Sequence, residues 1–219
     1  MSRPIDSQVQ NHTLVSRRRD EILQAAIRVF RSKGFHEATT RMIAREANVT
    51  QSNLYNYVRT KGDILYLVCE YLVGLYEQGL ADVVQTHDDP RDRLLGGLKA
   101  ILHIMLQHKE ELVLLYNETH ALEKDDRRQI LKSVSRLNGA FQRIVTDYEN
   151  AVGPLLVSNR RIAANLMTFV PAIVALRWWD LSAQASPDVI EDQIFRFVLN
   201  GLGVAPDGDR PLDHEGGNS

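Results

Sequence analysis

The chain has 219 residues, of which 44% are hydrophobic and 25% are charged, and its formal net charge is −2. This length allows one large or two small domains with a buried core. A single cysteine, Cys69, excludes an internal disulfide. The longest apolar run is too short to span a bilayer, and the N-terminus lacks a signal-peptide core. We therefore expect a cytoplasmic protein without a membrane partner.

Charge is distributed unevenly along the chain. Residues 1–61 carry eleven Lys and Arg against five Asp and Glu, whereas residues 62–219 carry fifteen against twenty-three. A head with a net charge of +6 on a body of −8 favours binding of a polyanion by the head. Chance asymmetry is the alternative, because charge alone does not identify a partner.

Apolar residues recur with helical spacing along nearly the whole chain, and no segment keeps the period of a strand. The sequence therefore predicts an all-α fold. Caps and apolar stripes predict helices at Arg17–Lys33, Arg41–Ala47, Gln51–Tyr57, Lys61–Gln85, Arg91–His108, Glu110–Ala121, Asp125–Ala151, Asn159–Leu181 and Asp188–Leu202. Pro171 should kink the eighth helix. Gly96 and Gly97 indicate either a close helix approach or a hollow for a ligand.

Residues 39–58 have the pattern of a helix-turn-helix. Two short helices joined by a tight turn pack steeply only where the crossing residues are small or apolar, as Ala44, Val49 and Leu54 are. Asn48 tolerates the left-handed conformation that the turn needs. In this motif the second helix lies in the major groove of DNA, and its N-terminal residues face the base edges.

The second helix of this motif is rich in side chains that make directional hydrogen bonds. Its expected exposed positions are Gln51, Ser52, Asn53 and Asn56. Gln and Asn amides can pair bidentately with adenine. Tyr55, Tyr57 and Lys61 can reach backbone phosphates. A polar helix pair in an unrelated helical protein is the alternative, because this motif alone gives false positives.

The N-terminal domain of the TetR family of bacterial repressors resembles one long run of this sequence, ILQAAIRVFRSKGFHEATTRMIAREANVTQSNLYNYVRTKGDIL. The resemblance implies contacts to phosphates by Thr40, Arg41 and Lys61, to bases by Gln51, Ser52 and Asn53, and to the DNA backbone by Tyr55 and Tyr57. Val58 and Gly62 stand where Phe and Glu are frequent in the family, which puts only the local packing in doubt.

The family resemblance divides the chain into four expected parts. Residues 1–16 form a flexible N-terminal arm, and residues 17–62 form a three-helix DNA-binding domain. Residues 63–204 form a helical domain that binds a ligand and dimerises. The polar residues 205–219, rich in Gly and Pro, form a disordered tail.

Dimerisation in this family implies a four-helix bundle made by the last two helices of each subunit. The run IAANLMTFVPAIVALRWW is apolar on nearly all sides, as a helix buried between its own core and a partner would be. The expected interface residues are Phe169, Ile173, Ile190, Ile194, Phe197 and Val198. A buried helix in a monomer is the alternative.

The segments LVLLYNETHALEKDDRRQILKSV and LRWWD resemble the subgroup of the family that senses fatty acyl-CoA and related CoA thioesters. The resemblance implies pocket positions for Tyr116, Glu118, His120, Arg177 and Trp178. A solvated helix end or a salt bridge is the alternative for Glu118 and His120. The short link NAVGPLLVSNR departs from the longer, glycine-rich link that is usual in the subgroup.

We therefore expect a homodimeric, ligand-responsive repressor that a small apolar ligand, such as an acyl-CoA, releases from double-stranded operator DNA. The sequence has no P-loop, nucleophile elbow or metal-ligand pair, so we expect neither an enzyme nor a cofactor or metal. The alternatives are a helical interaction scaffold that does not bind DNA, and an activator of the same fold.

Overall fold

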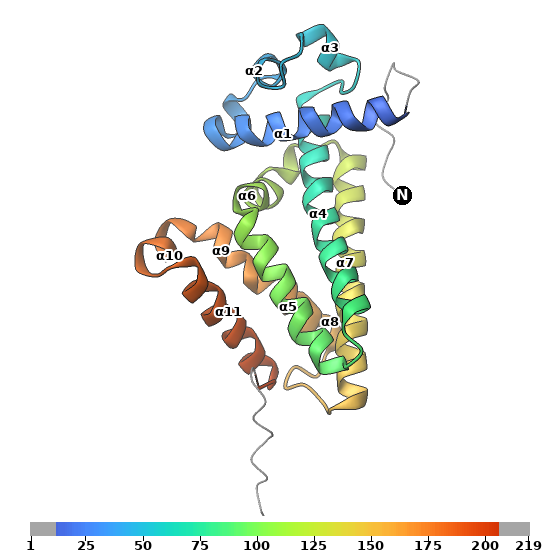
Figure 1. Cartoon of the computed structure of the whole chain (residues 1–219), viewed down its shortest axis with the longest axis vertical. Helices are drawn as coiled ribbons and strands as arrows, with labels where there is room; N and C mark the ends of the chain where they lie inside the picture. Colours follow the sequence, from blue (N-terminus) through green and yellow to red (C-terminus); the bar gives the residue numbers. More distant parts are fainter. Residues whose placement is uncertain (1–11, 206–219) are drawn as a thin grey trace, which may run out of the picture. The chain divides into compact units, whose positions relative to one another are not determined.

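The computed structural model describes residues 12–205, with side chains from residue 17 onward. Every regular element in this range is a helix, which confirms the predicted all-α fold (Figure 1). The elements are α1 (His12–Glu37), α2 (Thr40–Glu46), α3 (Gln51–Tyr55), α4 (Lys61–Thr86), α5 (Pro90–Gln107), α6 (Lys109–Glu118), η1 (Thr119–Ala121), α7 (Lys124–Ala151), α8 (Arg160–Phe169), η2 (Val170–Ala172), α9 (Ile173–Leu176), α10 (Trp178–Gln184) and α11 (Pro187–Leu202).

Helix α1 differs from its prediction at both ends. It begins at His12 instead of Arg17, so residues 12–16, which were expected in a flexible arm, are helical. At Gly34 the backbone takes a φ of 75°, which glycine adopts without steric cost. Helical structure resumes after this kink and continues to Glu37, four residues beyond the predicted end at Lys33. The predicted tail lies outside the described residues, except for Ala205.

The predicted helix over residues 159–181 is divided into the pieces α8, η2, α9 and α10. Pro171 lies in η2, a 3-10 turn between α8 and α9, where its missing N–H interrupts the α-helical hydrogen bonds. A second break at Arg177 leaves Arg160–Leu176 and Trp178–Gln184 bent by 77°. Within residues 12–205, no single helix is long and apolar enough to cross a membrane. Among these residues, only this bent pair has sufficient length and apolar character when its two segments are taken together.

The chain divides into two compact units. The first contains the described part of Met1–Gln78 together with Gln107–Leu137. The second contains Gly79–Leu106 together with the described part of Asn138–Ser219. The first unit includes Gln107–Leu137 because α6 packs against α1.

The core of the first unit fixes the three N-terminal helices on one another. Helix α1 packs on α2, and α2 packs on α3. Figure 1 shows α2 and α3 next to each other. The residues that meet there are buried and apolar: Ile22, Ala26 and Phe30 of α1, Ile43 and Ala44 of α2, and Leu54 of α3. Burial of these side chains supplies the main stabilisation of short helices that would not form alone.

In the second unit, a pair of glycines lets α5 approach its neighbours closely. A Cβ atom added at Gly97 would lie 3.2 Å from Leu80 Cδ1 and 3.3 Å from Phe141 Cε1. A Cβ atom added at Gly96 would lie 3.1 Å from Val83 Cγ1. All three distances are tighter than ordinary contacts, so the structure favours close helix packing over a hollow for a ligand at these glycines.

Candidate nucleic-acid interface

The turn between α2 and α3 is built by local sequence signals. The Thr39 side chain accepts a hydrogen bond from the Met42 backbone N–H at 3.2 Å, which caps the start of α2. Asn48 takes a φ of 55°, and the Val49 N–H then donates to the Ala44 carbonyl at 2.9 Å. Thr50 caps α3 by accepting from the Asn53 N–H at 3.1 Å. This short segment therefore sets its own geometry, as a helix-turn-helix does.

Helix α3 buries one residue and exposes the residues before it. Leu54 has no exposed surface and anchors the helix to the core. Gln51, Ser52 and Asn53 are exposed, and all three carry groups that donate and accept hydrogen bonds. Asn56 is only half-buried and already interacts with other groups. The exposed polar row of α3 is therefore Gln51–Ser52–Asn53, at the N-terminal end where a recognition helix meets base edges.

Three polar side chains link the start of α2 to α3. The Thr40 Oγ1 and Tyr55 Oη atoms are 3.0 Å apart, and Gln51 Nε2 lies 3.4 Å from each of them. Hydrogen bonds from Thr40 and then Gln51 lower the pKa of Tyr55, because they stabilise its phenolate form. The three side chains hold one another in place on the surface that carries the exposed row of α3.

Two arginines lie beside the turn, in an open groove of about 480 Å³. The groove is lined by Arg41, Ala44, Arg45, Asn48, Val49, Thr50 and Gln51. Arg41 was among the predicted phosphate contacts, whereas Arg45 was not. Residues four apart share one face of a helix, so the spacing of the two arginines could have indicated Arg45 as well.

Lys61 has a structural role that the sequence did not reveal. Its Nζ atom donates to the backbone carbonyls of Phe35 at 2.8 Å, Ala38 at 3.0 Å and His36 at 3.2 Å. It also lies 4.5 Å from the centre of the Phe35 ring. An ammonium has three donors, and all three are engaged here. This geometry argues against the predicted phosphate contact, because no N–H remains to bind DNA.

Tyr57 is the second predicted contact that the structure places in another environment. Only 6% of its surface is exposed, and the neighbouring Val58 is fully buried. The prediction assumed that both tyrosines of the Leu54–Tyr57 run face outward, as the half-exposed Tyr55 does. Helix α3 ends at Tyr55, so the chain turns there and carries Tyr57 into the core.

The predicted ligand residues are divided between the two units. Tyr116, Glu118 and His120 lie in the first unit, and Arg177 and Trp178 lie in the second. The Oε2 atom of Glu118 is 3.3 Å from Nε2 of His36, so this carboxylate forms an ion pair with α1 when the imidazole is protonated. Glu118 therefore fits the alternative of a salt bridge. His120 and Arg177 are exposed, and Trp178 is half-buried.

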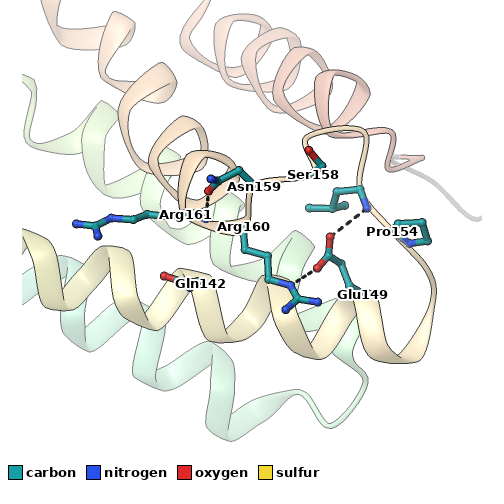
Figure 2. Close-up of a pocket in the computed structure, with 8 residues that line it drawn as sticks. Gln142, Glu149, Pro154, Ser158, Asn159, Arg160 and Arg161 are labelled. Carbon is teal, nitrogen blue, oxygen red and sulfur yellow. Dashed lines mark hydrogen bonds and ion pairs between the residues drawn. The ribbon is translucent and has the colours of Figure 1, made fainter.

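A cavity of about 550 Å³ lies at the link between α7 and α8 in the second unit. Figure 2 shows Glu149 facing Arg160 across it, while Arg161 points away from that pair. Glu149 forms an ion pair with Arg160 and accepts from the Leu155 N–H at 3.4 Å. The hydrogen bond from Arg160 lowers the pKa of Glu149. None of the predicted ligand residues lines this cavity, and its facing charges neutralise each other.

The second unit exposes a row of apolar side chains at helical spacing. Its members are Ile162, Leu166, Phe169, Ile173, Leu176 and Trp179 along α8, α9 and α10, with Val189 and Phe197 on α11. Phe197 is 71% exposed and Trp179 70%. Several large apolar side chains exposed on neighbouring helices are typical of an interaction site. Below, these eight residues are called the apolar face.

Three of the predicted interface residues belong to the apolar face, namely Phe169, Ile173 and Phe197, and Ile194 is half-buried beside it. Ile190 and Val198 do not belong to it, because each is only 5% exposed and packs inside its own subunit. The prediction assigned them to the wrong side of α11. Two apolar stripes on one helix cannot be told apart from the sequence alone, because both show the same period.

Within the part of the chain that the structure describes, no group of three His, Cys, Asp or Glu side chains could hold a metal ion. Cys69 has no exposed surface, and burial raises the pKa of its thiol to about 12. The thiol therefore stays protonated at neutral pH.

The fold and the helix-turn-helix agree with comparisons to known proteins. Residues 22–66 match the family described as bacterial regulatory proteins, tetR family, and residues 87–202 match the tetracyclin repressor-like C-terminal domain. The chain is similar to the transcriptional regulator HbdR of Aromatoleum sp. (strain CIB), at 30% identity over 66% of this chain and 68% of that protein.

Two further relatives from Mycolicibacterium smegmatis differ in their named activity. The transcriptional repressor KstR2 is 29% identical over 46% of this chain and 49% of that protein. The transcriptional activator FasR is 23% identical over 86% of this chain and 84% of that protein.

Solved structures share the fold at low identity. A tetR-family regulatory protein from Rhodococcus RHA1 has a TM-score of 0.75 at 22% identity, covering 86% of this chain and 98% of that one. FadR from Bacillus subtilis, solved in complex with stearoyl-CoA, has a TM-score of 0.69 at 16% identity, covering 84% and 98%. The two matched domains together span most of the described residues. The chain therefore belongs to the TetR family and is a DNA-binding transcriptional regulator, not an enzyme.

Proposed function

We propose that this regulator is a homodimeric repressor that reads operator DNA with α3 and leaves it when a small apolar effector binds. The observation that carries the proposal is the row Gln51–Ser52–Asn53, three exposed hydrogen-bonding side chains on a helix whose Leu54 is fully buried. Side-chain amides at the start of a recognition helix can pair with base edges in the major groove.

The residues around this row supply the phosphate contacts. Thr40 and Tyr55 are held together by their hydrogen bond, and Arg41 and Arg45 bring two guanidinium groups to the adjoining groove. Phosphate contacts set the position of the protein on the duplex, and base contacts set the sequence that it prefers. Asn56, Tyr57 and Lys61 are left out of this surface, because each is engaged or buried in the first unit.

The dimer forms through the apolar face of the second unit. A two-fold interface brings the same surface of two subunits together, so one exposed apolar row is matched by its own copy. Each subunit then places one α3 on DNA, and the two must meet successive major grooves about 34–36 Å apart. An effector causes release if it binds better to a conformation in which this spacing is lost.

The effector class is a small apolar molecule such as a fatty acyl-CoA. The support is the likeness of fold to FadR, which was solved with stearoyl-CoA. Tyr116 and His120, both in the first unit, are the candidate residues for the effector site, while Glu118 is assigned to its ion pair with His36.

An activator of the same fold is the second candidate, favoured by the similarity to FasR over 86% of this chain. The two candidates differ in what happens after DNA binding, because an activator raises transcription from the DNA that it occupies.

A gel shift with the DNA upstream of the protein's own gene tests the proposal, at low and raised salt, with stearoyl-CoA, butyryl-CoA or free CoA added. We expect specific retardation that weakens steeply with salt and is abolished by an acyl-CoA but not by free CoA. Transcription in vitro from the same DNA should fall with the protein present. A rise would support the activator, and retention of no promoter fragment would support a scaffold without DNA binding.

A further inference from the structure

Two tyrosines of α4 are buried to the same degree but differ at their hydroxyl groups. Tyr66 is 2% exposed, and its Oη donates to Glu70 Oε1 at 3.4 Å. Tyr76 is 3% exposed, and its Oη has no hydrogen-bond partner among the side chains and backbone that the structure describes. Both rings lie on the same helix in the same unit, so the two side chains differ only in the hydrogen bonding of their hydroxyl groups.

A buried hydroxyl without a partner costs free energy, and buried polar groups in proteins are nearly always paired. Phenylalanine would fill the space of the Tyr76 ring without this cost. A hydroxyl kept in such a place therefore points to a partner that is not part of the chain.

The groups around Tyr76 define the chemistry of that partner. Burial raises the pKa of Tyr76 well above its ordinary value, and the nearby Tyr116 and Glu111 of α6 add to the effect. Burial also raises the pKa of Tyr116. Both phenols therefore remain neutral O–H donors at neutral pH. A donor in an apolar surrounding is matched by a hydrogen-bond acceptor.

Glu111 restricts the acceptor further. Glu111 is only 8% exposed, and its Oε1 lies 3.4 Å from Nδ1 of His108, with which it forms an ion pair when the imidazole is protonated. An anionic group next to Tyr76 would meet the field of a buried carboxylate, which is screened little by solvent. The acceptor that fits is therefore neutral, as the carbonyl oxygen of a thioester, ester or ketone is, and not a free carboxylate.

We propose that Tyr76 forms the polar end of the effector site and donates its hydrogen bond to a neutral carbonyl oxygen of the effector. Tyr116 of α6, close enough to raise the pKa of Tyr76, is 37% exposed, whereas Tyr76 is 3% exposed. The inference rests on the proposed effector response and narrows its chemistry. A hydrogen bond from Tyr76 would also orient the effector, because apolar contacts alone have no preferred direction.

The test compares Tyr76→Phe with the matched control Tyr66→Phe in the full chain. In thermal unfolding without added ligand, Tyr76→Phe should be as stable as the wild type or more stable, because it loses no internal bond. Tyr66→Phe should unfold a few degrees lower, roughly the shift expected for one lost hydrogen bond. Binding is then measured by calorimetry with stearoyl-CoA and with stearate, whose head group is a carboxylate.

We expect the wild type to bind stearoyl-CoA more tightly than stearate. The Tyr76→Phe variant should bind stearoyl-CoA on the order of ten-fold more weakly, the usual effect of one lost hydrogen bond to a ligand. The Tyr66→Phe variant should retain wild-type affinity. A tighter interaction with stearate than with stearoyl-CoA would overturn the neutral acceptor.

Two outcomes separate this inference from the proposed function. If stearoyl-CoA binds equally to the wild type and Tyr76→Phe, then water occupies the hydroxyl and the inference fails while the effector response stands. A loss of stability in Tyr76→Phe equal to that in Tyr66→Phe also overturns it. If the wild type binds neither probe, native mass spectrometry of the purified protein decides: a bound carbonyl compound that Tyr76→Phe lacks supports the inference, and its absence overturns both.

Discussion

Helix α3 exposes amide and hydroxyl side chains, whereas the helices α8 to α11 also expose large apolar side chains. The exposed residues of α3 carry amide and hydroxyl groups, and the fully buried Leu54 anchors the helix to the core. The face of α11 carries Val189 and Phe197, and Phe197 is 71% exposed. Exposure alone does not identify a partner. Hydrogen-bonding groups bind selectively to a partner with a matching pattern of donors and acceptors. Apolar groups bind to any complementary apolar surface.

The difference also explains why one face tolerates water and the other does not. Amides on α3 exchange hydrogen bonds with water at little net cost until DNA replaces the water. Exposed aromatic and aliphatic side chains on α8 to α11 have no such exchange, so their burial is favourable whenever a matching apolar surface is available. The polar face should therefore decide specificity, and the apolar face should decide assembly.

The largest effect is expected from the apolar face. Replacing Phe169 and Phe197 by Asp in one variant puts four charges into each two-fold interface, and burying an unpaired ion costs several kcal/mol. The dimer should dissociate, and operator affinity should fall although α3 is intact, because a lone subunit holds only one half-site. Sedimentation measured together with a gel shift checks both expectations.

The control is Leu131→Asp, which places one charge at a 58% exposed apolar residue of α7 outside this face. It should remain dimeric and bind DNA normally. If the double variant also remains dimeric, the interface lies elsewhere on the molecule.

A smaller effect is expected from Lys61. Lys61→Met removes an ammonium that binds three carbonyls, and hydrogen bonds to a charged group contribute about 1.5–3 kcal/mol each. The free energy of unfolding should fall by about 3 kcal/mol in urea titration, since partial hydration of the carbonyls offsets part of the loss. The salt slope of DNA binding should stay constant.

Lys33→Met is the matched control, because Lys33 is an exposed lysine of α1. It should leave the free energy of unfolding unchanged. A salt slope that flattens by about one unit in Lys61→Met would return this residue to the phosphate contacts.

The polar face should respond through sequence preference. Asn53→Ala should cost about 1–3 kcal/mol on operator DNA, because one bidentate base contact is lost, and should barely change binding to unrelated DNA. Fluorescence anisotropy with both DNAs measures the difference. Asn150→Ala, at an exposed amide of α7, should change neither affinity. Equal losses on both DNAs for Asn53→Ala would mean that Asn53 does not read bases.

The smallest effect concerns the Tyr55 hydroxyl. Thr40→Val removes the hydrogen bond that contributes most to lowering the pKa of Tyr55. The phenolate loses a donor while the neutral phenol does not, so the pKa of Tyr55 should rise toward its ordinary value. NMR titration of the Tyr55 ring follows the change, and Ser52→Ala should leave the titration unaltered. A lower pKa in Thr40→Val would contradict the assigned geometry.

The helix-turn-helix could be predicted because its determinants are close together in sequence. Thr39 and Thr50 cap the helices next to them, and Asn48 supplies the left-handed turn between. Each interaction spans five residues or fewer, so composition and spacing were sufficient. The same holds for Pro171, whose ring disrupts its own helix.

Other features depend on groups that meet across long stretches of sequence, and pattern alone did not predict them. Lys61 binds carbonyls 23 to 26 residues away, which removes it from the predicted DNA contacts. Ile190 and Val198 repeat with the same period as Phe197, and only packing decides which side faces the core. The missing hydrogen bond of the Tyr76 hydroxyl cannot be predicted from the sequence, because it depends on which groups surround the ring in the folded chain.

The contact between Lys61 and α1 also has a consequence for hydrogen exchange. Lys61 is the first residue of α4, and the carbonyls that it binds lie in the last turn of α1 and just after it, two places where helices ordinarily fray independently. With one ammonium bound to both, neither end opens without releasing the other. Amide protons in the last turn of α1 and the first turn of α4 should therefore exchange with deuterium as one cooperative unit, at a single opening free energy.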